Sequence, residues 1–241
     1  KAWPHRRAVV KVAATTKEFS GVAQTQKIGF VFAGQGSQLS GMGRELYQST
    51  ALFKQVVDEA CEYLQPLLGY DLKLAMLNEA HDISDTIYAQ PAIFVFGLAY
   101  GKLLLSRGLH PDVLLGHSIG EYVAAVLAGV VSAEDGLKIV AKRAQLAQTM
   151  PRGVMLSVAS DVAGLEALLT DLPLDIAAIN AAKNVVVAGE ASAIAELQKR
   201  LSVASIGAMP LPTSHAFHSR WMASQTVSSA PSPVTVTPSK P

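Results

Sequence analysis

The chain has 241 residues, of which half are apolar and 16% are charged, and its formal net charge is +1. This composition favours a folded α/β protein with one large core, alone or with a small satellite domain, and argues against disorder over most of its length. The near-neutral balance, without a dense stretch of Lys and Arg, argues against a partner made of nucleic acid or an anionic membrane surface.

Cysteine content and apolar runs predict the cellular setting. The single cysteine, Cys61, excludes an internal disulfide, and it lies in an apolar stretch with helical spacing, as a core residue would. The chain has no charged start followed by an apolar run of the kind found in secretory signals. The longest apolar stretch, residues 91–105, is interrupted by polar residues and is too short to cross a bilayer. We therefore expect a cytoplasmic protein without a membrane anchor.

The first 26 residues are weakly periodic and contain one possible strand at residues 8–13. Residues 27–32 are the first clear predicted strand, and they run directly into the glycine-rich sequence A-G-Q-G-S-Q at residues 33–38. Such a loop can bring backbone close to a ligand or a catalytic atom, although a plain tight turn is the alternative. It lacks the G-K-S/T ending and the G-x-G-x-x-G spacing of phosphate-binding loops.

Helical patterns follow the loop at residues 43–47, 52–68 and 90–107, and a short buried strand is predicted at residues 112–115. A helix is predicted at residues 121–131, and another begins at the capping residue Ser132 with acidic residues in its first turn. Arg143 falls near the end of that last helix, where position alone favours a surface cation that complements the helix C-terminus. This order of strands and helices predicts an α/β fold.

The sequence G-H-S-I-G at residues 116–120 separates the buried strand from the helix that follows it. Glycine at both ends allows a sharp turn that would expose Ser118, with the N–H groups that start the helix beside it. Such N–H groups can stabilise an oxyanion. The pattern also arises by chance in a chain rich in Ala and Gly, but its position between strand and helix favours a nucleophile.

A different rhythm begins at residue 154. The predicted order is strand, helix, strand, strand, helix, strand, over residues 154–159, 162–170, 174–180, 184–188, 192–203 and 205–211. This β-α-β-β-α-β order is typical of a ferredoxin-like domain. We expect it to be inserted into the larger α/β unit and to form one wall of a cleft that faces Ser118.

The sequence S-H-A-F-H-S at residues 214–219 contains two histidines, and a serine nucleophile at neutral pH needs such a base. His5, His81 and His110 lie in polar or loop-like surroundings and are expected to be solvated, whereas His117 adjoins Ser118. A pair of histidines can also bind metal, but no further His or Cys cluster completes such a site. We therefore predict no metal.

These segments resemble a known family. The sequences G-Q-G-S-Q (34–38), Q-P-A (90–92), G-H-S-I-G-E (116–121) and H-A-F-H (215–218), with Arg143 between the last two, follow the order and spacing of malonyl-type acyltransferases. The chain is most similar to the acyltransferase domains of modular type I polyketide synthases, over about residues 27–219. The resemblance implies an α/β-hydrolase-like large subdomain with a parallel sheet, plus an inserted ferredoxin-like small subdomain.

The resemblance also implies a site. Ser118 would carry the acyl group as an ester, His218 would act as general base and acid, and the backbone N–H groups of Gln35 and Ile119 would form the oxyanion hole. The other implied substrate-binding residues are Arg143, Gln90, His117, His215, Phe217 and Asn180. No metal or bound cofactor is implied, since malonyl-CoA would be the acyl donor and the phosphopantetheine thiol of an acyl carrier protein the acceptor.

Three of these residues bear on the choice of acyl group. A planar guanidinium at Arg143 can hold the free carboxylate of malonyl with two hydrogen bonds, and a monocarboxylic acyl chain would leave that cation unpaired. In the resembling family, Ile119 after the serine and the H-A-F-H sequence accompany malonyl rather than methylmalonyl. Phe217 is expected to fill the space that an α-methyl group would need.

The domain layout follows from the same resemblance. Residues 1–26 are expected to be the end of a linker from a ketosynthase, 27–151 the large subdomain, and 152–212 the small one. Residues 213–222 return to the large subdomain with the histidine, and 223–241, rich in Ser, Thr and Pro, are an expected flexible tail. Neighbouring synthase domains are the expected partners, and the isolated domain is an expected monomer.

The chain departs from the family after the histidine motif, where it reads Arg220-Trp221-Met222 and the usual later elements do not follow. Two other classes therefore stay open. A serine hydrolase or thioesterase of the α/β type would need an acidic partner for the histidine, and Asp161, Asp171 and Asp175 are the acids available between the two motifs. An inactive, truncated docking domain is the second alternative.

Overall fold

The computed structural model describes residues 5–12, 15–22 and 27–223. At the N-terminal end, β1 (His5–Val12) pairs antiparallel with β2 (Thr15–Val22) over their whole length. The sequence predicted a strand close to β1 but missed β2. The reason is compositional, because β2 is mostly polar and gives no alternation of apolar residues to recognise.

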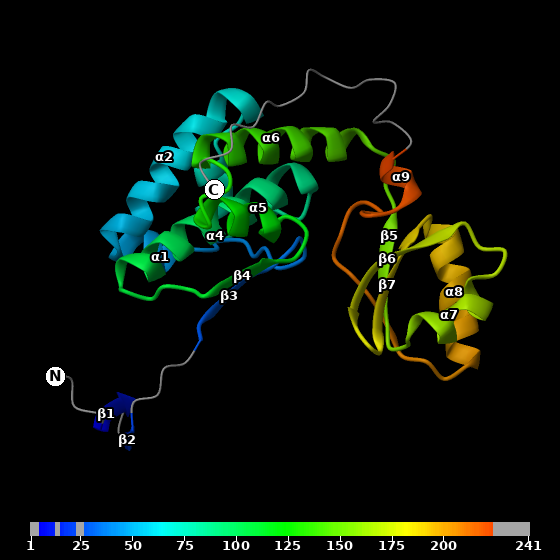
Figure 1. Cartoon of the computed structure of the whole chain (residues 1–241). Coiled ribbons are helices and arrows are strands. Elements are labelled where there is room, and N and C mark those ends of the chain that lie inside the picture. Colours follow the sequence, from blue (N-terminus) through cyan, green and yellow to red (C-terminus); the bar gives the residue numbers. More distant parts are fainter. Residues whose placement is uncertain (1–4, 13–14, 23–26, 224–241) are drawn as a thin grey trace.

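The first group of packed elements surrounds a parallel strand pair, β3 (Gly29–Phe32) and β4 (Val113–Gly116) (Figure 1). Phe30 and Phe32 point into the core, while Val31 between them is exposed, so the pair is covered on one face. The helices of this group are α1 (Arg44–Ser49), α2 (Ala51–Leu68), α3 (Leu72–Leu77), α4 (Thr86–Ser106), α5 (Gly120–Leu127) and α6 (Ala133–Thr149). Only α3 has no counterpart in the sequence-based prediction.

Helix α4 is the core of this group. It packs against α2, α5 and α6, and its apolar residues lie all around its axis, as expected for a buried helix. The sequence analysis judged the apolar stretch at residues 91–105 too short to cross a bilayer. This judgement of length was wrong, because α4 has 21 residues and is, by length and composition, able to cross a membrane. Most of its apolar window is buried inside the protein, which is the environment of a core helix.

The parallel pairing of β3 and β4 brings two distant loops together. The register runs from Gly29 opposite Val113 to Phe32 opposite Gly116, so both strands end at the same edge. The glycine-rich loop leaves β3 there, and the turn that carries Ser118 leaves β4 beside it. Loops at the carboxyl ends of parallel strands are where α/β proteins place their sites.

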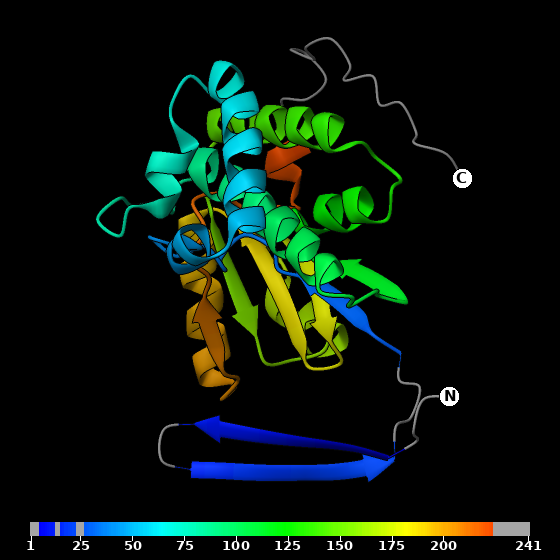
Figure 2. The ribbon, with the colours of Figure 1, turned by 90° about the vertical axis from the view of Figure 1, so that its left-hand side faces the viewer.

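The second group has the element order β5 (Val154–Val158), α7 (Val162–Leu169), β6 (Leu174–Ala181), β7 (Asn184–Gly189), α8 (Ala191–Val203) and β8 (Ala208–Pro210). Its strands form an antiparallel sheet in the order β6-β7-β5-β8. Figure 2 shows α7 and α8 on one face of this sheet. On the other face, three sheet residues pack against Ala216 and Phe217; they are Met155, Val186 and Ala188. The histidine segment, residues 214–219, thus covers the face of the sheet that carries no helix.

Arg220, at the start of α9 (Arg220–Ala223), fastens the end of the histidine segment to the second group. Its guanidinium donates to Asp175 of β6, with 2.6 Å from Nη2 to Oδ1 and 2.9 Å from Nε to Oδ1. Its backbone N–H donates to Asp175 Oδ2 at 2.7 Å. These hydrogen bonds from Arg220 hold the pKa of Asp175 below its usual value. Arg220, at which the chain departs from the family that its motifs resemble, thus forms a tertiary contact.

This contact predicts a pH-dependent contribution to stability. Because the pKa of Asp175 is lower in the folded chain, the carboxylate stabilises the fold above its unfolded pKa of about 3.9 and loses that effect as the pH falls through the folded value. Asp175→Asn should lower the melting temperature at pH 7 by at most a few degrees, since Arg220 is largely exposed.

Thermal melts of the native chain and Asp175→Asn between pH 7 and pH 2 check this expectation. Asp85→Asn is a suitable control, since Asp85 makes a single 3.3 Å contact with exposed Arg152. A difference between the native chain and Asp175→Asn that persists at pH 2 would contradict the ionic origin of the effect.

Candidate active site

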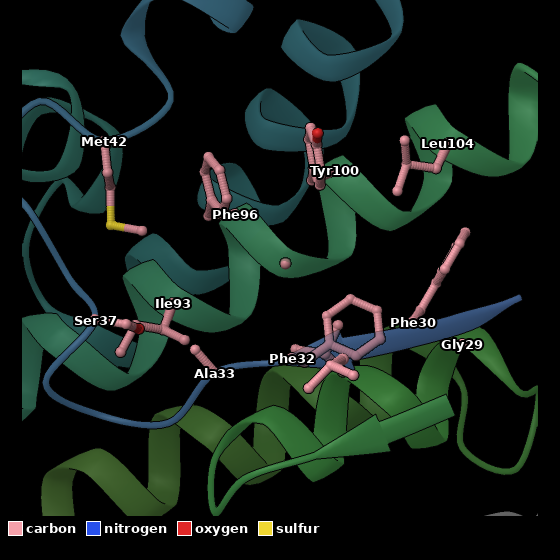
Figure 3. A pocket seen from close by; sticks show the side chains of 13 residues that line it. Gly29, Phe30, Phe32, Ala33, Ser37, Met42, Ile93, Phe96, Tyr100 and Leu104 are labelled. Carbon is pink, nitrogen blue, oxygen red and sulfur yellow. The ribbon is translucent and has the colours of Figure 1, made fainter. Parts of the chain in front are cut away.

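One sizeable cavity lies away from the place where the candidate catalytic residues meet. It has a volume of about 440 Å³ and lies between β3 and α4 (Figure 3). Its lining is mostly apolar, with side chains such as Phe30, Phe32 and Phe96, and Tyr100 is its one ionisable residue. Acid-base chemistry near neutral pH needs groups that this cavity lacks.

Ser118 lies on the sharp turn between β4 and α5, and its backbone has a positive φ of 52°. The turn requires glycine on both sides. A Cβ at residue 116 would come within 2.1 Å of the backbone N of Glu121, and one at Gly120 within 2.3 Å of the Phe32 carbonyl oxygen. Close approach of the turn to β3 thus explains the glycines of the motif and leaves the Ser118 hydroxyl facing a cavity.

His218 reaches Ser118 from the far end of the chain. The hydroxyl oxygen of Ser118 lies 2.8 Å from His218 Nε2, a hydrogen-bond distance between residues 100 positions apart. His218 also has a positive φ, 59°, a conformation that non-glycine residues rarely adopt. Two strained backbone positions therefore present the two side chains to each other, a combination that is frequent at functional sites.

The surroundings of His218 keep its imidazole neutral. Partial burial of the ring lowers its pKa below the usual value, and the nearby positive charge of Arg143 and the ring of His117 lower it further. A neutral imidazole with an unprotonated Nε2 can accept the Ser118 proton. The arrangement is thus that of a hydroxyl nucleophile beside a general base.

Arg143 projects from α6 into the same cavity, instead of completing the end of its helix as a surface cation. Its Nη2 donates to the Ser118 hydroxyl at 3.2 Å, and its Nη1 donates to Gln90 Oε1. Burial lowers the pKa of the guanidinium, yet arginine stays charged in proteins. Among the described residues, no carboxylate forms a salt bridge with Arg143, and a desolvated cation of this kind beside Ser118 suits an anionic ligand.

The backbone N–H groups of Gln35 and Ile119 are available for a ligand. Gln35 lines the cavity with Ser118, and Ile119 follows Ser118 directly at the N-terminal end of α5. Within residues 27–222, neither N–H donates a hydrogen bond. Unused N–H groups around a nucleophile can accept the charge of a developing oxyanion.

The small cavity of about 70 Å³ at Ser118 lies between the two groups of elements. His117, Asn180 and Phe217 line it, as the sequence suggested, and His117 Nε2 is 3.2 Å from Asn180 Oδ1. Sequence reasoning missed the remaining wall, which consists of Met155, Ala178, Val186, Leu211 and Thr213. These residues carry no motif, because they lie on β5, β6 and β7 or just after β8 and meet the site only after folding.

His215 departs from the expected role. Its side chain is fully buried and is not among the residues that line the cavity around Ser118. Its Nδ1 is 2.7 Å from the Ser214 hydroxyl, and its ring packs against Phe217 with ring centres 5.8 Å apart. In this position His215 supports Phe217 from behind, and the expected contact with substrate is corrected accordingly.

Gln90 and the previously unnoticed Thr86 form a buried polar pair on α4. Both are fully buried, and Gln90 Nε2 donates to the Thr86 hydroxyl at 2.5 Å. The Thr86 hydroxyl donates in turn to Gln35 Oε1 at 3.1 Å. Sequence reasoning missed Thr86 because the predicted helix began at residue 90, whereas α4 begins four residues earlier.

The acids between the two motifs have other partners or positions. Asp161 caps α7 by accepting from the Gly164 N–H, and Asp175 binds Arg220. None of Asp161, Asp171 and Asp175 lines the cavity at Ser118. In the part of the chain that the structure describes, no group of three His, Cys, Asp or Glu side chains could hold a metal ion.

Comparison with known proteins agrees with this geometry. Residues 29–240 match the family described as "Acyl transferase domain". The chain is 38% identical over 89% of its length to the polyketide synthase GfsB of Streptomyces halstedii, and spans 4% of that protein. It is 35% identical over 80% of its length to the acyltransferase homolog BaeD of Bacillus velezensis, of which it spans 62%.

Solved structures give the same result. The acyltransferase domain from the second module of the salinomycin polyketide synthase superposes with a TM-score of 0.80 at 35% identity, over 91% of this chain and 56% of that one. The transacylase MCAT from Streptococcus pneumoniae gives a TM-score of 0.69 at 32% identity, over 81% and 66%. The resemblance seen in the sequence motifs is confirmed, and the chain belongs to the acyl transferase domain family.

Proposed function

We propose that this chain loads an extender unit, malonyl, from malonyl-CoA onto the phosphopantetheine thiol of an acyl carrier protein in a polyketide synthase. The observation that carries the proposal is the 2.8 Å contact between Ser118 Oγ and His218 Nε2, with Arg143 within 3.2 Å of the same hydroxyl. A nucleophile, a neutral base and a desolvated cation in one small cavity suit a carboxylated acyl thioester.

In the first half-reaction, the Ser118 oxygen attacks the thioester carbonyl while its proton passes to His218 Nε2. The carbonyl electrons collect on an oxygen that faces the N–H groups of Gln35 and Ile119. As the carbonyl re-forms, the C–S bond breaks and the imidazolium returns its proton to the CoA sulfur. The acyl group is then an ester of Ser118, and CoA leaves.

The second half-reaction reverses the sequence with another thiol. The phosphopantetheine sulfur of the carrier protein attacks the ester, and His218 takes its proton and then gives it to the departing Ser118 oxygen. Atoms and charge balance without a metal or a redox group. The proposal therefore includes no bound cofactor, only the CoA donor and the prosthetic thiol of the partner.

Arg143 and Phe217 are the proposed determinants of the acyl group. The guanidinium would bind the free carboxylate of malonyl, whereas acetyl would leave a buried cation without an anion. Phe217 is 5% exposed and forms part of the wall of the small cavity, which limits space beside the acyl Cα. We assign further contacts with the acyl-CoA to Gln90, His117 and Asn180.

The proposed layout has two subdomains. Residues 27–151 and 213–222 form an α/β-hydrolase-like large subdomain, and residues 152–212 form a ferredoxin-like one, in keeping with the strand order β6-β7-β5-β8. Residues 1–26 would join a ketosynthase, and the expected tail at residues 223–241 lies, apart from residue 223, outside the described residues. We further propose a cytoplasmic synthase whose neighbouring domains are partners, and a monomer for the isolated domain, which light scattering would test.

The decisive experiment is intact-protein mass spectrometry after brief incubation with malonyl-CoA, methylmalonyl-CoA or acetyl-CoA. We expect a malonyl-sized adduct on the native chain, much weaker adducts from the other donors, and none on Ser118→Ala, because the other hydroxyl of the cavity lining, that of Thr213, has no base as hydrogen-bond partner in the described part of the chain. Addition of a phosphopantetheinylated carrier protein should then remove the adduct and acylate the carrier.

Other outcomes select the alternatives. Release of free malonate at the rate of CoA production, with no acylated carrier, would indicate a hydrolase or thioesterase. A folded protein that forms no adduct with any donor would indicate an inactive docking domain and would refute the proposed transfer.

Removal of the cation should change selectivity more than it changes chemistry. For Arg143→Ala we expect the ratio of malonyl to acetyl acylation rates to fall roughly 100-fold, the scale for loss of one partner of a buried charged hydrogen bond. Lys138→Ala, which removes another cation of α6, is the matched control and should keep the native ratio, since Lys138 pairs with Glu134 and does not line the cavity at Ser118. Acylation rates measured in parallel with malonyl-CoA and acetyl-CoA give this ratio. An unchanged ratio in Arg143→Ala would contradict the proposal that Arg143 binds the malonyl carboxylate.

The pKa of His218 predicts the pH dependence. Only the neutral imidazole accepts a proton, so the acylation rate should fall below a midpoint that lies under the ordinary histidine value of about 6.5. In Arg143→Ala the midpoint should move upward, because a positive charge that disfavours the imidazolium is gone. Acylation by acetyl-CoA between pH 5 and pH 8 measures both midpoints, and a native midpoint above 6.5 would contradict the assignment.

A further inference from the structure

We propose that Thr86 is a positioning residue that couples the Gln35 loop to the Arg143 guanidinium through a chain of buried hydrogen bonds. The inference rests on the proposed function, in which the Gln35 loop supplies an oxyanion contact and Arg143 binds the acyl carboxylate. Thr86 itself does not line the cavity at Ser118, so it would act through its neighbours.

The chain of hydrogen bonds has three links. Arg143 Nη1 donates to Gln90 Oε1, Gln90 Nε2 donates to the Thr86 hydroxyl at 2.5 Å, and the Thr86 hydroxyl donates to Gln35 Oε1 at 3.1 Å. The three links join α6, α4 and the loop after β3, and a further hydrogen bond, from the Ile87 N–H to Gln148 Oε1 at 3.3 Å, joins α4 to α6 beside them. Thr86 and Gln90 are fully buried, so their polar atoms need these partners.

The direction of donation is fixed by the charge at one end. A guanidinium only donates, so Gln90 must present its oxygen to Arg143 and its N–H to Thr86. The Thr86 oxygen is then an acceptor, and its single proton is free to bind the Gln35 oxygen. One cation thereby sets the orientation of two amides, and hydrogen bonds aligned in this way strengthen one another in a buried setting.

The alignment leaves one polar atom of Gln35 unpaired. While its oxygen is bound to Thr86, the buried Nε2 of Gln35 has no partner in the described part of the chain. The loop's own contacts are local, such as the Ser37 hydroxyl on the Gly34 carbonyl at 2.8 Å. Thr86 is therefore the residue that connects the Gln35 side chain with a rigid helix.

The test compares a substitution at Thr86 that removes the hydroxyl with one that keeps it. Thr86→Val keeps the shape but leaves the Gln90 N–H and the Gln35 oxygen unpaired, so we expect Ser118 acylation by malonyl-CoA to slow roughly tenfold or more. Thr86→Ser keeps the hydroxyl and should stay within about twofold of the native rate. Thr149→Val is the matched control, since that exposed hydroxyl bonds only to a carbonyl of its own helix.

Two further readouts separate positioning from a loss of stability. In an Arg143→Ala background, Thr86→Val should slow acylation by acetyl-CoA less than it does in the native protein. The reason is that Arg143→Ala already removes the first link, from Arg143 to Gln90, in the series of hydrogen bonds. Hydrogen exchange of residues 33–38 should be faster in Thr86→Val and unchanged in Thr149→Val. Should Thr86→Val fail to fold, Gln35→Met removes the acceptor at the other end and takes its place.

The outcomes are distinct. Thr86→Val that acylates within about twofold of the native rate, or that leaves exchange of residues 33–38 unchanged, overturns the inference even when the native chain transfers malonyl. A native chain that forms no adduct refutes the proposed function instead. In that event the exchange measurement, which needs no activity, alone decides whether Thr86 holds the loop.

Discussion

The contact between the Ser118 hydroxyl and the His218 ring is the interaction on which the site depends. The two residues are 100 positions apart and belong to a turn after β4 and to the segment after β8. They meet only because the antiparallel sheet packs its open face against Ala216 and Phe217 and returns the chain to the parallel strands. The second group of elements thus positions His218 and also forms one wall of the cavity.

Backbone strain concentrates where this contact is made. Ser118 and His218 both have positive φ values, and glycines at 116 and 120 allow the turn to press against β3. Such conformations persist only where surrounding contacts over-determine them. Around His218 those contacts include the buried His215 ring, which packs against Phe217, and the ion pair between Arg220 and Asp175. Residues outside the cavity therefore help to position His218 beside Ser118.

A single buried charge organises the polar side of the cavity. Arg143 donates both to Ser118 and to Gln90, and through Thr86 its influence extends to the Gln35 loop. It also lowers the pKa of His218, which favours the neutral base. One side chain thereby bears on ligand charge, on the proton acceptor and on loop position. Among the described residues that line the cavity, none is Asp or Glu. A carboxylate there would neutralise the Arg143 cation.

The sequence by itself determined the local parts: the strand and turn of G-H-S-I-G, the cap at Ser132, the β-α-β-β-α-β order and the family. The structural elements follow from periodicity, glycine and capping chemistry, which act over a few residues, whereas the family follows from the resemblance of the motifs. Position in its helix alone gave Arg143 a surface role, and the family resemblance gave it a place in the site, where the structure has it. Only the tertiary structure decided that His215 packs against Phe217 outside the cavity lining and that Thr86 links two elements. Those facts depend on contacts between residues that are distant in the chain, and no local pattern encodes which faces will meet.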